Sequence, residues 1–156
     1  MENTSLITKF YTAFSNSDAI EMAYCYHDEA VFEDPAFGKL NHDEVVAMWK
    51  MLLERSKGNL KIEFKNVISD EKSGSATWIA TYIFSQTNRK VVNVIDVEFE
   101  FKDGLIIKHK DNFDIYKWSK QALGWKGFLL GWTPFMQNGI QQNAKKSLAN
   151  YIKKTT

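Results

Sequence analysis

Apolar residues recur at helical spacing in three stretches near the amino terminus. The first stretch follows Ser5, which can cap a helix, and its apolar members are Leu6, Ile7, Phe10, Tyr11 and Phe14. A short second helix is expected to end at Tyr24. A third helix is expected after Asn41, because Glu44 completes a capping signature, and it ends near Gly58. The pattern predicts three amino-terminal helices.

The hydrophobic pattern then changes to the alternation that is typical of strands. Four stretches are rich in β-branched and aromatic residues, namely 60–68, 76–86, 90–101 and 105–116. Lys102-Asp103-Gly104 is a hairpin signal because glycine accepts positive φ, so the last two strands are expected to be antiparallel. Three helices followed by four long strands predict one α+β domain.

Composition excludes several classes of protein. The chain has 156 residues with 44% hydrophobic and 14% aromatic residues, enough for one domain with a core. Its formal charge is +1, which argues against a nucleic-acid partner and makes a membrane partner unlikely in this interpretation. The first residues lack a signal-peptide pattern, so a soluble, cytoplasmic protein is expected. Cys25 is the only cysteine, which excludes an internal disulfide.

Asp34 stands directly before Pro35 in an otherwise apolar stretch. Proline disfavours the helical region for the residue before it, so Asp34 is expected in an extended segment that points across the fold. Its neighbours include Val31, Phe32 and Phe37, and partial desolvation among them makes a carboxylate more basic. The sequence therefore allows two interpretations, a general base or an aspartate that caps a turn.

Alternation along the last two strands predicts which polar side chains face the interior. Asn93 shares the face of the apolar residues in its strand, and His109 and Asp111 share the face of Phe113. Side chains two apart on a strand lie about 7 Å apart, so both can reach one bound molecule. The alternatives are an interior histidine satisfied by the backbone and a metal ligand, the weaker one because no known ligand spacing is present. No metal and no cofactor are expected.

These features together resemble the NTF2-like superfamily, in its SnoaL-like and ketosteroid-isomerase-like branch. The resemblance covers about residues 6–116 and rests on the helices, the sheet, the Asp34-Pro35 pair and a last strand that contains His109, Asp111 and Phe113. It implies a cone of three amino-terminal helices against a curved antiparallel sheet, whose mouth admits a small hydrophobic molecule. By resemblance Asp34 occupies the place of the catalytic base of ketosteroid isomerases, which act with an oxyanion hole of one tyrosine and one protonated aspartate.

The oxyanion hole of ketosteroid isomerases is not matched. Phe10 occupies the tyrosine position in an ungapped match, and Tyr11 beside it is expected to point elsewhere. Asp96 resembles the second donor, but alternation turns it outward, so that only a β-bulge would bring it to the pocket. Losing one oxyanion donor costs about 100-fold or more in rate, so steroid isomerisation is not expected.

The last strand is similar to other branches of the superfamily. Asp111 matches the acid/base aspartate of SnoaL-like polyketide cyclases and one active-site aspartate of limonene-epoxide hydrolases. Those hydrolases also need an arginine and a second aspartate around a water. Arg55 and Arg89, the only arginines, are expected at a helix end and at a strand turn, so that triad is not evident.

Periodicity also suggests the walls of the pocket. Trp78 and Tyr82 share one face of their strand, and together with Phe10, Trp49 and Asn93 they are the expected substrate-binding residues, although such aromatic stripes are commonly plain core. The opposite face of the same strand is also apolar. A homodimer through the outer face of the sheet is therefore expected.

Residues 117–156 extend beyond the domain of residues 1–116 as a helical extension. Trp118, Trp125 and Trp132 stand among glycines, and apolar residues at helical spacing follow. The extension can form a lid, a dimer seal or a membrane contact. We expect a buried lid or seal, with the lysines as a solvated face.

Two classes of function follow. The first is a cofactor-independent acid/base enzyme of isomerase, cyclase or hydrolase type, in which Asp34 or Asp111 moves a proton on a small hydrophobic molecule and His109 is the partner acid. The second is a small-ligand-binding protein without turnover, and a protein-interaction adaptor is a further alternative.

Overall fold

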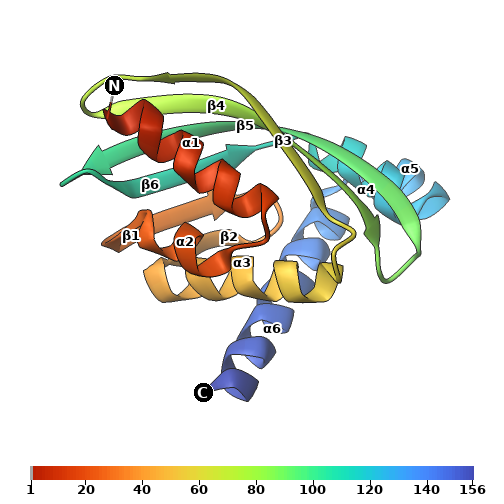
Figure 1. Ribbon diagram of the computed structural model, residues 1–156. Helices are drawn as coiled ribbons and strands as arrows, with labels where there is room; N and C mark the ends of the chain where they lie inside the picture. Colours follow the sequence, from red (N-terminus) through yellow and green to blue (C-terminus); the bar gives the residue numbers. More distant parts are fainter. Residues whose placement is uncertain (1) are drawn as a thin grey trace.

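A curved six-stranded sheet is the frame of the computed structural model, which describes residues 2–156 (Figure 1). The strand order is β2-β1-β6-β5-β4-β3. The strands are β1 (Tyr26–Asp34), β2 (Gly38–Asn41), β3 (Lys61–Ser69), β4 (Ser73–Phe84), β5 (Arg89–Lys102) and β6 (Leu105–Asn112).

Strands β3 to β6 confirm the four predicted strands, and β1 and β2 extend the sheet beyond them. All neighbours pair antiparallel except β1 and β6, which run parallel. The four predicted strands pair antiparallel as expected, and the parallel pair involves β1, which was not predicted as a strand. Its strands are far apart in the chain, so no local turn signal announces their pairing.

Three helices at the amino terminus are confirmed as α1 (Glu2–Ser15), α2 (Ala19–Tyr24) and α3 (His42–Ser56). The predicted capping box of α3 is present, with Asn41 and Glu44 each accepting a hydrogen bond from the other's backbone N–H. The helices lie on the concave side of the sheet, and their apolar faces join it in one core (Figure 1). Helices and sheet together enclose the interior of the cone.

Alternation assigns the faces of β4 and β5 as predicted. Trp78 on β4 pairs with Ile95 on β5, and both are buried on the concave face. The outer face carries Ile83, Val92 and Val94, which are 45%, 42% and 56% exposed. Homodimer formation through this apolar face stays a prediction.

The extension forms three helices, α4 (Ile115–Leu123), α5 (Trp125–Leu130) and α6 (Pro134–Thr155). Strand β6 ends earlier than predicted because Asp114 caps α4 by accepting a hydrogen bond from the Lys117 N–H. Trp118 on α4 packs against Val91 of β5, and α6 lies along α3 with Leu148 buried in the core. Both helices lie below the curved sheet in the view of Figure 1.

The expectation that the apolar residues of the extension are buried was only partly correct. Trp118 is 9% exposed, whereas Trp125 and Trp132 are 70% and 64% exposed. Trp118 lies on α4, which packs directly on the sheet. Trp125 lies on α5, which packs on α4 and has no strand beneath it that buries its other side. Hydrophobicity along the chain does not distinguish these two situations.

Gly127 is the point of closest approach between α5 and α4. A Cβ at this position would overlap the carbonyl oxygen of Ser119, which is backbone and cannot rotate away. We expect Gly127→Ala to lower the free energy of unfolding by about 2 kcal/mol or more, measured by urea unfolding. Gly139→Ala on α6 is the matched control, since its Cβ meets no atom within 4 Å, and it should raise stability by about 0.5–1 kcal/mol. Equal stability of Gly127→Ala and the wild type would contradict this packing.

Candidate functional site

A chain of hydrogen bonds runs through the interior of the cone. Trp49 Nε1 on α3 donates to Tyr26 Oη on β1 at 2.9 Å, and that hydroxyl lies 2.8 Å from His109 Nδ1 on β6. His109 Nε2 lies 3.0 Å from Asp111 Oδ1, which also accepts from Trp78 Nε1 on β4 at 3.1 Å. One neutral tautomer of His109 satisfies every link, with Nδ1 accepting from Tyr26 and Nε2–H donating to Asp111.

The hydrogen-bond chain lies among aromatic side chains and is shielded from bulk water. His109 and Asp111 are 0% and 3% exposed. The rings of Phe99, Phe32 and Phe10 meet the imidazole edge-on, with centroids at 4.8, 5.0 and 5.6 Å. A buried carboxylate without donors is costly, so its two N–H donors are what allow Asp111 to occupy this place. The predicted inward orientation of both residues is confirmed, and backbone satisfaction of the histidine is replaced by side-chain partners.

Asp34 lies beside Asp111 because β1 and β6 are parallel neighbours. Phe32 pairs with His109 and Glu33 with Lys110, so the next residues along the two strands are Asp34 and Asp111. The charge of Asp111 is one of the causes that raise the pKa of Asp34, so the two carboxyl groups lie within electrostatic reach of each other. Sequence spacing cannot show this pair, since 76 other residues separate the two positions.

Asp34 has the properties of both interpretations that its sequence allows. Its Oδ1 accepts hydrogen bonds from the Ala36 and Phe37 N–H groups at 2.9 and 2.5 Å, which is the turn-capping arrangement. Burial and the negative charge of Asp111 outweigh these donors and raise the pKa of Asp34 to about 7. Both described hydrogen bonds end on Oδ1, so Oδ2 is the oxygen left to exchange a proton.

Tyr82 and Trp118 mark the side of the cone near Asp34, here called the mouth. Trp118 Nε1 on α4 donates to Tyr82 Oη at 2.7 Å. Burial is the main cause that raises the pKa of Tyr82, and the charge of Asp34 adds to it. Asn93 is half-buried on the same inner face, with Ala80 as its pairing partner. The first helix of the extension therefore closes over the mouth.

Tyr11 is a polar residue of the interior that sequence reasoning missed. Its side chain was expected to point away, but it is fully buried and stacks on Phe64 at 5.6 Å. Among side chains of residues 2–156, its hydroxyl is the one buried polar atom without a hydrogen-bond partner. Burial and the charge of Asp111 raise its pKa well above the usual value. The available signal was its position in the apolar stripe of α1.

The other predicted site residues divide between core and surface. Phe10, Trp49 and Trp78 are fully or almost fully buried and pack around the hydrogen-bond chain. Asp96 faces outward as predicted and accepts from Thr77 Oγ1 at 2.9 Å. The arginines are remote, since Arg55 binds Ser147 and Arg89 binds the Gln121 carbonyl. The residues that the structure describes include no group of three side chains placed to hold a metal.

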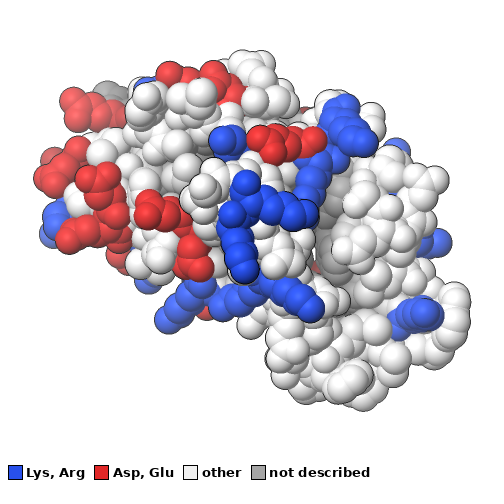
Figure 2. Space-filling model, turned by 90° about the horizontal axis from the view of Figure 1, so that it is seen from below, with Lys and Arg blue, Asp and Glu red and all other residues white. Residues whose placement is uncertain are grey.

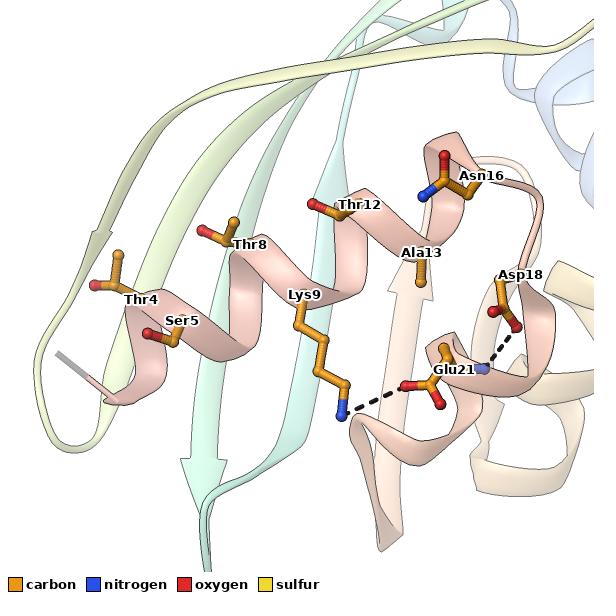
Figure 3. A pocket seen from close by; sticks show the side chains of 9 residues that line it. All are labelled: Thr4, Ser5, Thr8, Lys9, Thr12, Ala13, Asn16, Asp18 and Glu21. Carbon is orange, nitrogen blue, oxygen red and sulfur yellow. Dashed lines mark hydrogen bonds and ion pairs between the residues drawn. The ribbon is translucent and has the colours of Figure 1, made fainter.

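Two surface hollows lie away from the carboxylate pair. One of about 500 Å³ runs along α1 and α2, where Thr4, Thr8 and Thr12 follow one side of α1 and Lys9 reaches Glu21 at 3.5 Å (Figure 3). The other, of about 490 Å³, lies at the end of the sheet around Asp70 and Glu100. Both are open and lined mainly by surface side chains, so neither has the buried titratable groups expected of a catalytic centre.

The family model of the SnoaL-like domain matches residues 7–109, about two thirds of the chain. This chain belongs to the SnoaL-like domain family. The matched segment contains Asp34 and His109 and ends two residues before Asp111. The fold predicted from the resemblance is thereby confirmed, and solved structures of an NTF2-like protein and of a protein with a ketosteroid isomerase-like fold share it.

Solved structures share the fold at low sequence identity. Bal32a from a soil-derived mobile gene cassette has a TM-score of 0.68 at 18% identity, over 77% of this chain and 95% of that one. An LEH-like epoxide hydrolase of M. tuberculosis has a TM-score of 0.61 at 22% identity, over 83% and 96%. A candidate polyketide cyclase of Xanthomonas campestris pv. campestris has a TM-score of 0.62 at 14% identity, over 77% and 96%. A search of curated proteins finds no match.

The variant Tyr26→Phe tests whether the hydrogen-bond chain stabilises the fold. Tyr26→Phe leaves Trp49 Nε1 and His109 Nδ1 without partners in a buried place. We expect a loss of about 2–4 kcal/mol in the free energy of unfolding, since each unpaired buried group costs about 1–3 kcal/mol. Tyr24→Phe is the control because Tyr24 is 68% exposed on α2, and it should change stability by less than about 0.5 kcal/mol. A Tyr26→Phe variant with the same free energy of unfolding as the wild type would show that the hydrogen-bond chain contributes no stability.

The raised pKa of Asp34 makes the protein less stable as the pH rises. The pKa is about 7 in the folded state against a usual value of 3.8, so its contribution is complete below about pH 4 and is lost as the pH rises through 7. Asp34→Asn should therefore match the wild type near pH 4 and become more stable than it by pH 8. The full shift corresponds to about 4 kcal/mol, and partial exposure of the carboxyl reduces the expected gain to about half of that.

Thermal or urea unfolding at both pH values measures this difference. Asp28→Asn, at an exposed position of the same strand, is the control and should show no pH-dependent gain. If Asp34→Asn were less stable than the wild type at pH 8, the carboxylate would be stabilised by its donors rather than destabilised by burial.

Proposed function

We propose that this protein is a cofactor-independent enzyme that transfers protons on a small, uncharged, mostly apolar molecule. The observation that carries the proposal is the pair of carboxyl groups, Asp34 and Asp111, side by side on adjacent parallel strands within aromatic walls. Two carboxyl groups in one poorly solvated place cannot both ionise freely, so one of them stays ready to give or to take a proton near pH 7.

The roles of the residues follow from their contacts. Asp34 Oδ2 accepts a proton from a carbon next to a carbonyl and returns it to another atom of the same molecule, so that no external oxidant or reductant is needed. Asp111 is held in place by His109 Nε2 and Trp78 Nε1 and is the second carboxyl group of the pair. The unpaired Tyr11 hydroxyl is the donor available to a developing oxyanion, in place of the tyrosine expected at Phe10.

The substrate class follows from the walls of the cone. Phe10, Trp49 and Trp78 present apolar rings, and the paired carboxyl groups repel an anionic substrate. The names of two structural relatives, a polyketide cyclase and an LEH-like epoxide hydrolase, are consistent with carbonyl and epoxide chemistry. A substrate can enter only if α4 moves, because the hydrogen bond from Trp118 to Tyr82 closes the mouth.

Ligand binding without turnover is the second candidate. It is favoured by the dense ring packing of the interior, where centroids of Phe14 and Trp49 lie 4.9 Å apart and those of Phe14 and Trp78 lie 5.3 Å apart. In that case the polar groups anchor a ligand that displaces Trp118, and no proton is transferred.

Turnover measurements separate the two candidates. The purified protein is incubated with enones, β-keto esters, lactones and terpene epoxides, and products are followed by mass. Asp34→Asn should lower kcat/KM by about 100-fold or more, because it removes the proton-transfer group. Asp111→Asn should also lower kcat/KM, because it removes a charge that helps to raise the pKa of Asp34. The wild-type pH profile should show an apparent pKa near 7. Asp96→Asn, on the outer face, is the matched control and should retain full activity.

Two results would contradict the catalytic proposal. A wild type that binds members of the panel without converting them contradicts the catalytic proposal and supports ligand binding. Full activity in Asp34→Asn would remove that residue from the mechanism.

A further inference from the structure

Charge is unevenly distributed along the chain in a way that its net value of +1 conceals. Residues 115–156 contain seven lysines and no aspartate or glutamate, whereas the preceding residues contain 13 basic and 19 acidic residues. The extension is therefore a strongly basic module on an acidic domain. The whole-chain charge, used above to argue against a membrane partner, averages these two parts.

The same extension carries the largest concentration of exposed apolar side chains. Of thirteen large hydrophobic side chains that are exposed in residues 2–156, six lie between positions 125 and 135. These six are called the aromatic lobe and are Trp125 (70% exposed), Phe128 (60%), Leu129 (54%), Leu130 (47%), Trp132 (64%) and Phe135 (87%). Positions 125, 128 and 129 follow helical spacing on one side of α5, and Trp132 lies in the turn that follows this helix.

The aromatic lobe is held in a defined shape rather than loosely attached. Gly127 packs against the Ser119 backbone, Tyr116 Oη donates to the Phe128 carbonyl at 2.8 Å, and Trp132 Nε1 donates to the Leu129 carbonyl at 3.0 Å. The polar groups at these positions are thus satisfied within the protein while the apolar groups face outward. That is what entry into a poorly hydrated medium requires, because unpaired polar groups are costly there.

Basic side chains border this apolar surface. Figure 2 shows a largely uncharged lobe on the right of the view, with Lys and Arg side chains beside it and Asp and Glu gathered on the opposite side. Lys126 lies within the lobe's own sequence, and Lys145 and Lys146 lie exposed about 15 Å along α6 from Phe135. Lys153 and Lys154 lie exposed at the far end of α6. Aromatic and leucine side chains next to lysines are the composition of interfacial membrane anchors.

We propose that the aromatic lobe and the lysines of the extension dock the protein on the surface of an anionic lipid bilayer. No helix of residues 2–156 is long and apolar enough to cross a membrane, so the contact is interfacial. A second copy of the chain is a poorer occupant, since an isologous dimer through the lobe would bring two sets of seven lysines together. This inference does not depend on the proposed function.

Flotation with lipid vesicles tests the proposal. The full chain is mixed with vesicles of phosphatidylcholine alone and with vesicles that also contain about 30% phosphatidylglycerol, whose negative charge attracts basic side chains near the surface. Binding to the anionic vesicles should exceed binding to the neutral ones by about tenfold or more and should weaken in 0.5 M salt, where the screening length falls to about 4 Å.

Two double variants separate the apolar from the charged contribution. Phe128→Ser/Trp132→Ser should lower binding to anionic vesicles by about tenfold or more, because two exposed rings no longer enter the interface. Its control, Ile83→Ser/Val94→Ser, removes equally exposed apolar groups from the outer face of the sheet and should bind like the wild type. Lys126→Gln/Lys146→Gln should reduce binding, whereas Lys65→Gln/Lys72→Gln on and after β3 should not. Circular dichroism and unfolding confirm that each variant is folded.

Three outcomes would overturn the proposal. The first is a wild type that binds neither kind of vesicle. The second is equal loss of binding in the lobe variant and in its sheet-face control. The third is a dimer in sedimentation that Phe128→Ser/Trp132→Ser dissolves while vesicle binding is absent, which would make a second copy the occupant of the lobe.

Discussion

The hydrogen-bond chain from Trp49 to Trp78 is the interaction on which the interior depends. It joins α3, β1, β6 and β4 through Tyr26, His109 and Asp111, with each donor matched to an acceptor. An aromatic core would otherwise exclude a carboxylate, because desolvation of an unpaired charge is far more costly than a hydrogen bond is stabilising. The Asp111 carboxyl group can therefore occupy the centre of the cone only because the tryptophan and histidine N–H groups bind it.

Burial is the main cause of the raised pKa of Asp34, and the parallel pairing of β1 and β6 adds the charge of Asp111 as a further cause. The same turn aspartate on an antiparallel edge would be an ordinary cap. Beside a buried charge, and shielded from water, it becomes a group that titrates near neutral pH. Burial of the Asp34 carboxyl group lowers the stability of this region, and burial of the unpaired Tyr11 hydroxyl lowers it further. Unfavourable features that gather around a few titratable groups are typical of functional sites, where local stability is given up for chemistry.

The extension adds a second level of organisation. Helix α4 covers the mouth with Trp118, and the segment from Trp125 to Phe135, which includes α5, exposes six large apolar side chains. The element that closes the site is thus continuous with the element that is most suited to a lipid surface. The two elements are in direct contact where Gly127 packs against the Ser119 backbone.

The sequence by itself determined the three helices, the four long strands and the inward orientation of Asn93, His109 and Asp111, because these depend on local periodicity and caps. Only the tertiary structure decided that Asp34 and Asp111 are neighbours, since parallel pairing of distant strands has no local signal. It also decided that Tyr11 is buried and that Trp125 and Trp132 are exposed while Trp118 is buried. Hydrophobicity states that a side chain avoids water, but only the packing of neighbouring elements determines whether a partner surface within the chain is there to cover it.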